Sequence, residues 1–265
     1  MLFDLRGRRK RFIQVIYAIL ALLFTVSFVG FGIGSDAAGG IFDAFGLGSG
    51  GTGPDNPQYE ERIDAAKADL AEDPEDKAAL LELASTYALA GDDEVEVNER
   101  TGAPVLTEDA KPHYEQAIEY WERYLETDPR KPEGGIAAQL LNVYVLLAQS
   151  ATDPAEIEEL LDGVYHAAAV VAEDQPSANS LSTMAEFAYL SGREKQGDEA
   201  AEQALEEADK SERTQIRRYV EDAEKRGKSL QRQLKDLREA QGTTPEEAFQ
   251  NPFEDTAGGG LGGGF

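Results

Sequence analysis

Residue types that could do chemistry are sparse in this chain, which has two histidines, His113 and His166, and no cysteine. Neither histidine has another metal-binding side chain at the spacing of a known metal motif, and no disulfide can form. The chain also lacks a Gly-x-Ser-x-Gly motif, a Walker loop and a strand-led Gly-x-Gly-x-x-Gly motif. Its 51 aspartates and glutamates are expected on solvated helix surfaces. We therefore predict a protein that is not an enzyme and uses no metal or cofactor.

The charge of the chain restricts its partners. The formal net charge is −26, and most of the acidic excess lies before residue 205, whereas residues 205–240 are close to neutral. An acidic body repels nucleic-acid phosphates and anionic lipid headgroups, so we expect no nucleic-acid binding and no adsorption of the main domain to a membrane surface. Two interpretations stay open: solubility or adaptation to salt, and an acidic groove for a basic protein partner.

Residues 12–33 are nearly all apolar and predict a transmembrane helix. A helix of about 22 residues spans roughly 33 Å, which is enough to cross a hydrocarbon core of about 30 Å. Residues 1–11 form a basic tail, which should stay cytoplasmic and place the main domain outside the cytoplasm as a single-pass cell-membrane protein. A signal peptide cleaved near Ser35–Ala38 is the alternative, although its apolar region would be only about 7–15 residues long.

The rest of the chain divides into a linker, a helical region and a tail. Residues 34–56 are rich in glycine and indicate a flexible linker, and residues 241–265 have the composition of a disordered tail. Between them the capping and periodicity signals are all helical, which predicts an all-α domain. The expected helices cover 57–72, 75–90, 108–127, 132–149, 154–173, 177–191, 197–209 and 211–240.

Local signals mark several helix ends. Asp73 and Asp153, each followed by proline, are expected N-caps, and Glu156 would complete a capping box with Asp153. Gly91 and Gly192 stand where helices should stop. The 93–113 segment has only a weak hint of strand and is expected to bulge out as a loop.

The helices resemble tetratricopeptide (TPR) repeats, which are arrays of helix pairs. The first pair matches the TPR signature at the large and small positions that let two helices pack closely, namely Leu80, Leu83, Ala84, Tyr87, Ala117, Trp121 and Pro129. Weaker matches follow to residue 209. The resemblance implies a solenoid over residues 57–209 with about three repeats, two of them degenerate. A plain antiparallel helical bundle is the alternative.

In TPR arrays the first helix of each pair lines a concave groove that binds protein segments. The positions that the resemblance assigns to this groove are Leu81, Ser85 and Ala88, then Ala138, Asn142 and Val145, then Ser182, Glu186 and Tyr189. None of them is a lysine or arginine, so capture of a peptide's terminal carboxylate is not expected. The groove is suited to a protein or peptide segment that is basic or has apolar anchors.

The last expected helix, in the 210–240 segment, carries a heptad seam. Its apolar or small residues recur at spacings of four and three, as Ile216, Val220, Ala223, Gly227, Leu230, Leu234 and Leu237. Such a helix can cap the end of its own solenoid, or it can pair with a second chain. Because Gly227 lies within the seam, we favour the cap.

The N-terminal segment is similar to the anchor of bacterial membrane-tethered parvulin-type folding factors. The match consists of Phe3, Asp4, Arg6, Arg11, Gln14, Phe28, Phe31 and Gly32. No isomerase domain follows, so isomerase activity is not implied. We expect a membrane-anchored, protein-binding scaffold that assists exported proteins. A scaffold for division or wall-synthesis machinery in the cell envelope, or a structural oligomer built through the last helix, is the alternative.

Overall fold

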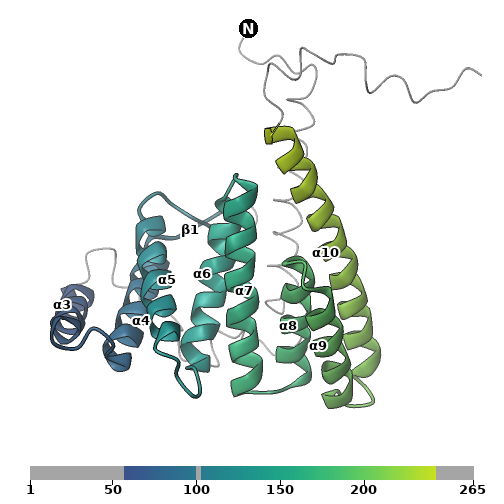
Figure 1. Ribbon diagram of the computed structural model, residues 1–265, viewed down its shortest axis with the longest axis horizontal. Helices are drawn as coiled ribbons and strands as arrows, with labels where there is room; N and C mark the ends of the chain where they lie inside the picture. Colours follow the sequence, from purple (N-terminus) through teal and green to yellow (C-terminus); the bar gives the residue numbers. More distant parts are fainter. Residues whose placement is uncertain (1–56, 100–102, 243–265) are drawn as a thin grey trace, which may run out of the picture.

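The computed structural model describes residues 57–99 and 103–242, and in this part the protein is an all-α domain with one short β-hairpin (Figure 1). The predicted basic tail, transmembrane helix 12–33, linker 34–56 and C-terminal tail lie outside the described residues. Among the helices described, none has both the length and the apolar character needed to cross a membrane. The elements are α3 (Pro57–Glu72), α4 (Lys77–Glu94), β1 (Glu96–Val97), β2 (Pro104–Val105), α5 (Ala110–Glu126), α6 (Gly134–Ser150), α7 (Pro154–Asp174), α8 (Ala178–Leu190), α9 (Glu194–Glu207) and α10 (Arg213–Gly242).

The helices follow one another in a row, in the order of the sequence (Figure 1). The most extensive contacts join α4 to α5, α6 to α7 and α8 to α9, so three consecutive helix pairs make up most of the domain. Helix α3 packs on α4 at one end of the row. At the other end the long helix α10 packs mainly on α8, and also on α9 and α7. Most contacts are therefore made between elements close in the sequence.

Of the five helix-end features expected from the sequence, the Asp153 cap and the Gly192 stop hold, whereas Asp153 and Glu156 form no capping box in the described part of the chain. Asp153 caps α7 by accepting a hydrogen bond from the Ala155 amide at 2.8 Å. Gly192 follows α8 with φ +79°, the left-handed conformation that glycine adopts without strain at a helix end. The expected cap at Asp73 is wrong, because α4 begins later, where Asp76 accepts from the amides of Ala78 and Ala79.

Gly91 does not end a helix, because α4 continues through it to Glu94. A Cβ atom at Gly91 would lie 2.5 Å from the Tyr114 ring of α5, so the absence of a side chain lets α4 and α5 approach closely. The same kind of contact, a glycine of one helix against a tyrosine ring of its partner, recurs in each helix pair. The contacts are Gly91 with Tyr114, Gly163 with Tyr144, and Gly197 with Tyr189.

The segment between α4 and α5 forms a β-hairpin rather than a plain loop. Its strands β1 and β2 pair antiparallel, with Glu96 opposite Val105. Thr107 closes the insertion: its hydroxyl donates to the Glu94 carbonyl at 2.8 Å and accepts from the Ala110 amide at 3.0 Å, at the start of α5. The hairpin exposes Val97 and Val105, the two large apolar side chains that reach solvent in the described part of the chain.

The helix side chains on which the TPR resemblance rests face inward. Trp121 is 1% exposed, and the leucine, alanine and tyrosine positions of the signature are buried in the same cluster. Pro129 follows Asp128, whose φ of +47° takes the chain out of the helical conformation after α5.

All seven residues of the heptad seam on α10 are also buried, and α10 contacts α8 and α9 of its own chain. The seam therefore closes the end of this domain.

Candidate functional site

The first helix of the first pair places two of the three expected groove residues at partly accessible positions. Leu81 and Ser85 on α4 are half-buried, whereas Ala88 is fully buried. The Ser85 hydroxyl donates to the side-chain oxygen of Gln139 on α6 at 3.2 Å. Ser85 thus joins α4 to α6 instead of standing free.

The expected groove positions of the second and third pairs are mostly buried. On α6, Ala138 and Val145 are about 6% and 5% exposed, and Asn142 is half-buried. On α8, Ser182, Glu186 and Tyr189 are all buried. Glu186 accepts hydrogen bonds from Tyr219 and Arg226 of α10. Where the resemblance assigns a groove to α8, the structure therefore places α10.

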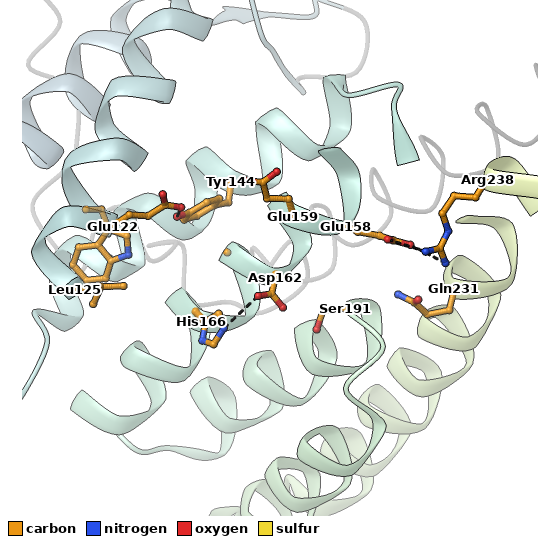
Figure 2. A pocket seen from close by; sticks show the side chains of 12 residues that line it. Glu122, Leu125, Tyr144, Glu158, Glu159, Asp162, His166, Ser191, Gln231 and Arg238 are labelled. Carbon is orange, nitrogen blue, oxygen red and sulfur yellow. Dashed lines mark hydrogen bonds and ion pairs between the residues drawn. The ribbon is translucent and has the colours of Figure 1, made fainter. Parts of the chain in front are cut away.

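A solvent-open cleft of about 600 Å³ lies on another part of the molecule (Figure 2). Four helices and the end of α8 build it, so residues far apart in the sequence converge there. It is lined by Trp121, Glu122 and Leu125 of α5, Tyr144 of α6, Glu158, Glu159, Asp162, Gly163 and His166 of α7, Ser191 after α8, and Gln231 and Arg238 of α10. Four of these twelve side chains are carboxylates, which gives the cleft an acidic character.

Two of the four carboxylates are matched by cations. Glu158 accepts from Arg238 of α10, with 3.1 Å between nitrogen and oxygen. Asp162 accepts from Arg193, which follows α8, and it also lies 3.4 Å from Nε2 of His166 (Figure 2). These pairs tie α7 to α8 and α10 along one side of the cleft.

The other two carboxylates, Glu122 and Glu159, have no cationic partner among the residues that the structure describes. Figure 2 shows them on either side of the Tyr144 ring. The Tyr144 hydroxyl donates to Glu122 at 3.4 Å. Partial burial raises the pKa of Glu122, the hydrogen bond from Tyr144 lowers it, and the charge of Glu159 raises it. Burial and both carboxylates raise the pKa of Tyr144, so its hydroxyl stays protonated and remains a donor.

The geometry of this cleft favours binding a cation. An incoming ammonium or guanidinium group would relieve the repulsion between Glu122 and Glu159, whereas the Tyr144 ring between them is only 4% exposed and offers no free face. Gly163 makes room for that ring, because a Cβ there would lie 2.6 Å from Cδ1 of Tyr144. Half-buried Leu125 supplies an apolar wall, behind which Trp121 is buried. In the described ranges no group of three or more His, Asp or Glu side chains has the arrangement of a metal site.

Sequence reasoning missed most of this site. Glu158, Asp162 and His166 follow one another at intervals of four, so they share one face of α7, and this spacing was the available signal. Glu122 and Glu159 had no such signal, because their proximity depends on how α5 packs beside α7. His113, the other candidate for acid–base chemistry, lies elsewhere, with its ring centroid 6.2 Å from that of Tyr87.

Comparisons with known proteins give no relative: no family model, no curated protein and no solved structure matches this chain. The chemistry of the cleft is therefore the basis for assigning a function.

Proposed function

We propose that this protein is a membrane-anchored scaffold whose extracytoplasmic domain binds a basic segment of another protein. Three consecutive helix pairs, each with a glycine packed against a tyrosine ring, support a TPR-like repeat array. Arrays of this kind present extended surfaces to protein segments rather than enclosed sites for small molecules. The basic tail and the apolar 12–33 segment support the anchor.

The observation that carries the proposal is the pair of unmatched carboxylates in the cleft. Glu122 and Glu159 flank Tyr144 beside an apolar wall. A lysine or arginine side chain suits this arrangement, because its charged end can bind both carboxylates while its aliphatic stem packs on Leu125. The net charge of −26 steers such a partner towards the domain.

The location of the domain narrows the class of partner. In the proposed topology, an anchor followed by a glycine-rich segment of about 23 residues keeps the domain within roughly 25–30 Å of the membrane surface. Proteins emerging from the membrane are available at that distance, so assistance to exported or cell-envelope proteins is the role we favour. The alternative role is organisation of wall-synthesis or division proteins. In that role the same cleft binds a protein that stays in the cell envelope.

A peptide-binding measurement tests the proposal. Two synthetic peptides of equal length, one alternating leucine with lysine and one alternating leucine with glutamate, are titrated into the detergent-solubilised full-length protein by calorimetry. We expect the lysine peptide to bind at least about tenfold more tightly, and the double variant Glu122→Gln/Glu159→Gln to lose about tenfold in affinity, a difference of about 1.4 kcal/mol. Added salt should weaken the binding, because both partners are charged.

The matched control removes the same charge elsewhere. Glu72 and Glu75 are exposed and lie outside the cleft, so Glu72→Gln/Glu75→Gln changes the net charge equally. It should leave the affinity for the lysine peptide within about twofold. If both double variants weaken binding equally, the net charge of the domain attracts the peptide and the cleft has no specific role.

A further inference from the structure

The contact between α10 and α8 contains a buried polar cluster. Glu186 of α8 is 0% exposed and accepts hydrogen bonds from both Arg226 and Tyr219 of α10. The Arg226 guanidinium also lies 5.9 Å from the centroid of the Tyr219 ring. A buried carboxylate is stable only with such partners, so Glu186 requires a cation at this one place on α10.

The next residue of α10 meets α8 even more closely. Gly227 is buried, and a Cβ atom there would lie 2.6 Å from the carbonyl carbon of Tyr189. The opposing atoms belong to the backbone of α8 and cannot rotate away as a side chain would. Only glycine therefore fits at this position while α10 keeps its distance from α8.

Apolar packing alone does not fix the position of α10 along its axis. The seam repeats every seven residues, so a shift of α10 by one heptad brings Ala223 to the place of Ile216 or Leu230, and Leu237 to the place of Leu230. Similar apolar side chains then fill similar holes. The seam by itself also suits pairing with the same helix of a second copy.

The two adjacent residues Arg226 and Gly227 distinguish these arrangements. In a register shifted by one heptad, Tyr219 or Gln233 takes the place of Arg226, and the buried Glu186 loses its cation. Val220 or Leu234 then takes the place of Gly227 and collides with the Tyr189 carbonyl. One register of α10 on α8 satisfies both conditions.

We propose that Arg226 and Gly227, with Glu186 and Tyr189 opposite them, form a register key that fixes α10 on its own chain and prevents its seam from pairing with a second copy. The register key also positions the cleft wall, because the α10 residues Gln231 and Arg238 reach the Leu190 carbonyl and Glu158 only in this register. The inference does not depend on what the cleft binds.

The absence of cysteine allows a direct test by site-specific crosslinking. Glu158 is changed to cysteine together with either Arg238→Cys, the native neighbour, or Gln231→Cys, one heptad earlier. The detergent-solubilised full-length protein is treated with a short bismaleimide, and mass spectrometry on mixed ¹⁴N- and ¹⁵N-labelled chains separates crosslinks within a chain from crosslinks between chains. The otherwise unchanged protein should give the 158–238 crosslink within one chain.

Both parts of the register key are then removed without leaving an unpaired charge, by the triple variant Glu186→Leu/Arg226→Leu/Gly227→Ala. We expect this variant to keep its helical circular dichroism, to lose at least half of the 158–238 crosslink in the first cysteine pair, and to gain the 158–231 crosslink in the second pair or interchain products in either. The control Leu230→Ala, which weakens the seam but keeps the register key, should lower the melting temperature and retain the 158–238 crosslink. Retention of the single native crosslink in the triple variant overturns the proposal. So does its complete unfolding, which would make the cluster a stability contact only.

Discussion

At the scale of single residues, the domain repeatedly pairs a tyrosine hydroxyl with a carboxylate. Tyr114 donates to Asp92 at 2.7 Å, and Tyr189 donates to Asp198 at 2.9 Å, and the Tyr144–Glu122 contact in the cleft belongs to the same group. In each case the tyrosine ring packs against a glycine of the partner helix. Close helix approach buries the ring, and the carboxylate satisfies its hydroxyl.

One of these contacts makes stability depend on pH. Burial raises the pKa of Asp92 from 3.8 to about 6, and the charge of Asp93 adds to the increase, while the hydrogen bond from Tyr114 lowers it. A carboxyl group whose pKa is higher in the folded chain binds more protons when folded. Its contribution is therefore complete below about pH 3.8 and is lost as the pH rises through about 6.

We predict that Asp92→Asn stabilises the domain at neutral pH, because asparagine keeps an acceptor for Tyr114 and carries no charge. A two-unit shift corresponds to about 3 kcal/mol for a shielded group, but Asp92 is exposed as a residue, so we expect about 1 kcal/mol at pH 7.5. The gain should fall to about half at pH 5.0. Urea denaturation of a fragment beginning at Pro54 measures both. An equal gain at the two pH values would show that Asp92 does not titrate in this range.

At the scale of elements, glycines decide how closely helices pack, and two of them provide a matched pair. A Cβ at Gly91 in α4 would lie 2.5 Å from the Tyr114 ring, whereas a Cβ at Gly135 in α6 would meet nothing within 4 Å. Both substitutions to alanine gain up to about 1 kcal/mol of helix propensity. At Gly91 this gain is opposed by overpacking, which costs about 1–3 kcal/mol.

We therefore predict that Gly91→Ala destabilises the domain by about 1 kcal/mol or more, and that Gly135→Ala is neutral or stabilising. Thermal and urea denaturation of the two variants give the comparison directly. If Gly91→Ala also stabilises the domain, α4 and α5 can move apart at no cost, and the glycine–tyrosine contact has no structural role.

Gly91 shows which features of the fold can be predicted from the sequence and which cannot. All eight helices predicted between residues 57 and 240 are present in the described part of the chain, because capping residues and apolar periodicity are local signals. Gly91 was expected to stop a helix, and its actual role depends on Tyr114, a residue brought near only by packing. The N-caps also differ in how well they are predicted. Asp153 caps its helix as predicted, whereas Asp76, three residues after Asp73, is the residue that caps α4.

The cleft could not be predicted from local sequence signals, because it too depends on packing between helices. Its acidic pair comes from α5 and α7, and its arginine comes from α10, so the pattern exists only after the helices have packed. The seam of α10 was visible in the sequence, but its burial on α8 was one of two alternatives. What decided between them is the fit of Gly227 and Arg226, which no periodicity reveals.

At the scale of the whole molecule, the distribution of charge and apolar residues supports the proposed membrane topology. The basic residues before residue 12 and the apolar 12–33 segment stand at one end of a chain that is otherwise strongly acidic. In the proposed topology, the positive-inside rule keeps the basic end in the cytoplasm, and the acidic domain is carried across the membrane. The proposed encounter with exported proteins requires this orientation.

We predict that alkaline phosphatase fused after Asp255 is active in intact cells, because this reporter needs the oxidising conditions outside the cytoplasm. A fluorescent protein that folds only in the cytoplasm, fused at the same residue, should stay dark. As a control, replacing Arg6, Arg8, Arg9, Lys10 and Arg11 with glutamine removes the orienting charge and should lower the phosphatase activity at least severalfold. An inactive phosphatase fusion with a fluorescent partner fusion would place the acidic domain in the cytoplasm. The cleft would then meet cytoplasmic proteins, and its proposed role at the exit from the membrane would fail even if it binds lysine peptides.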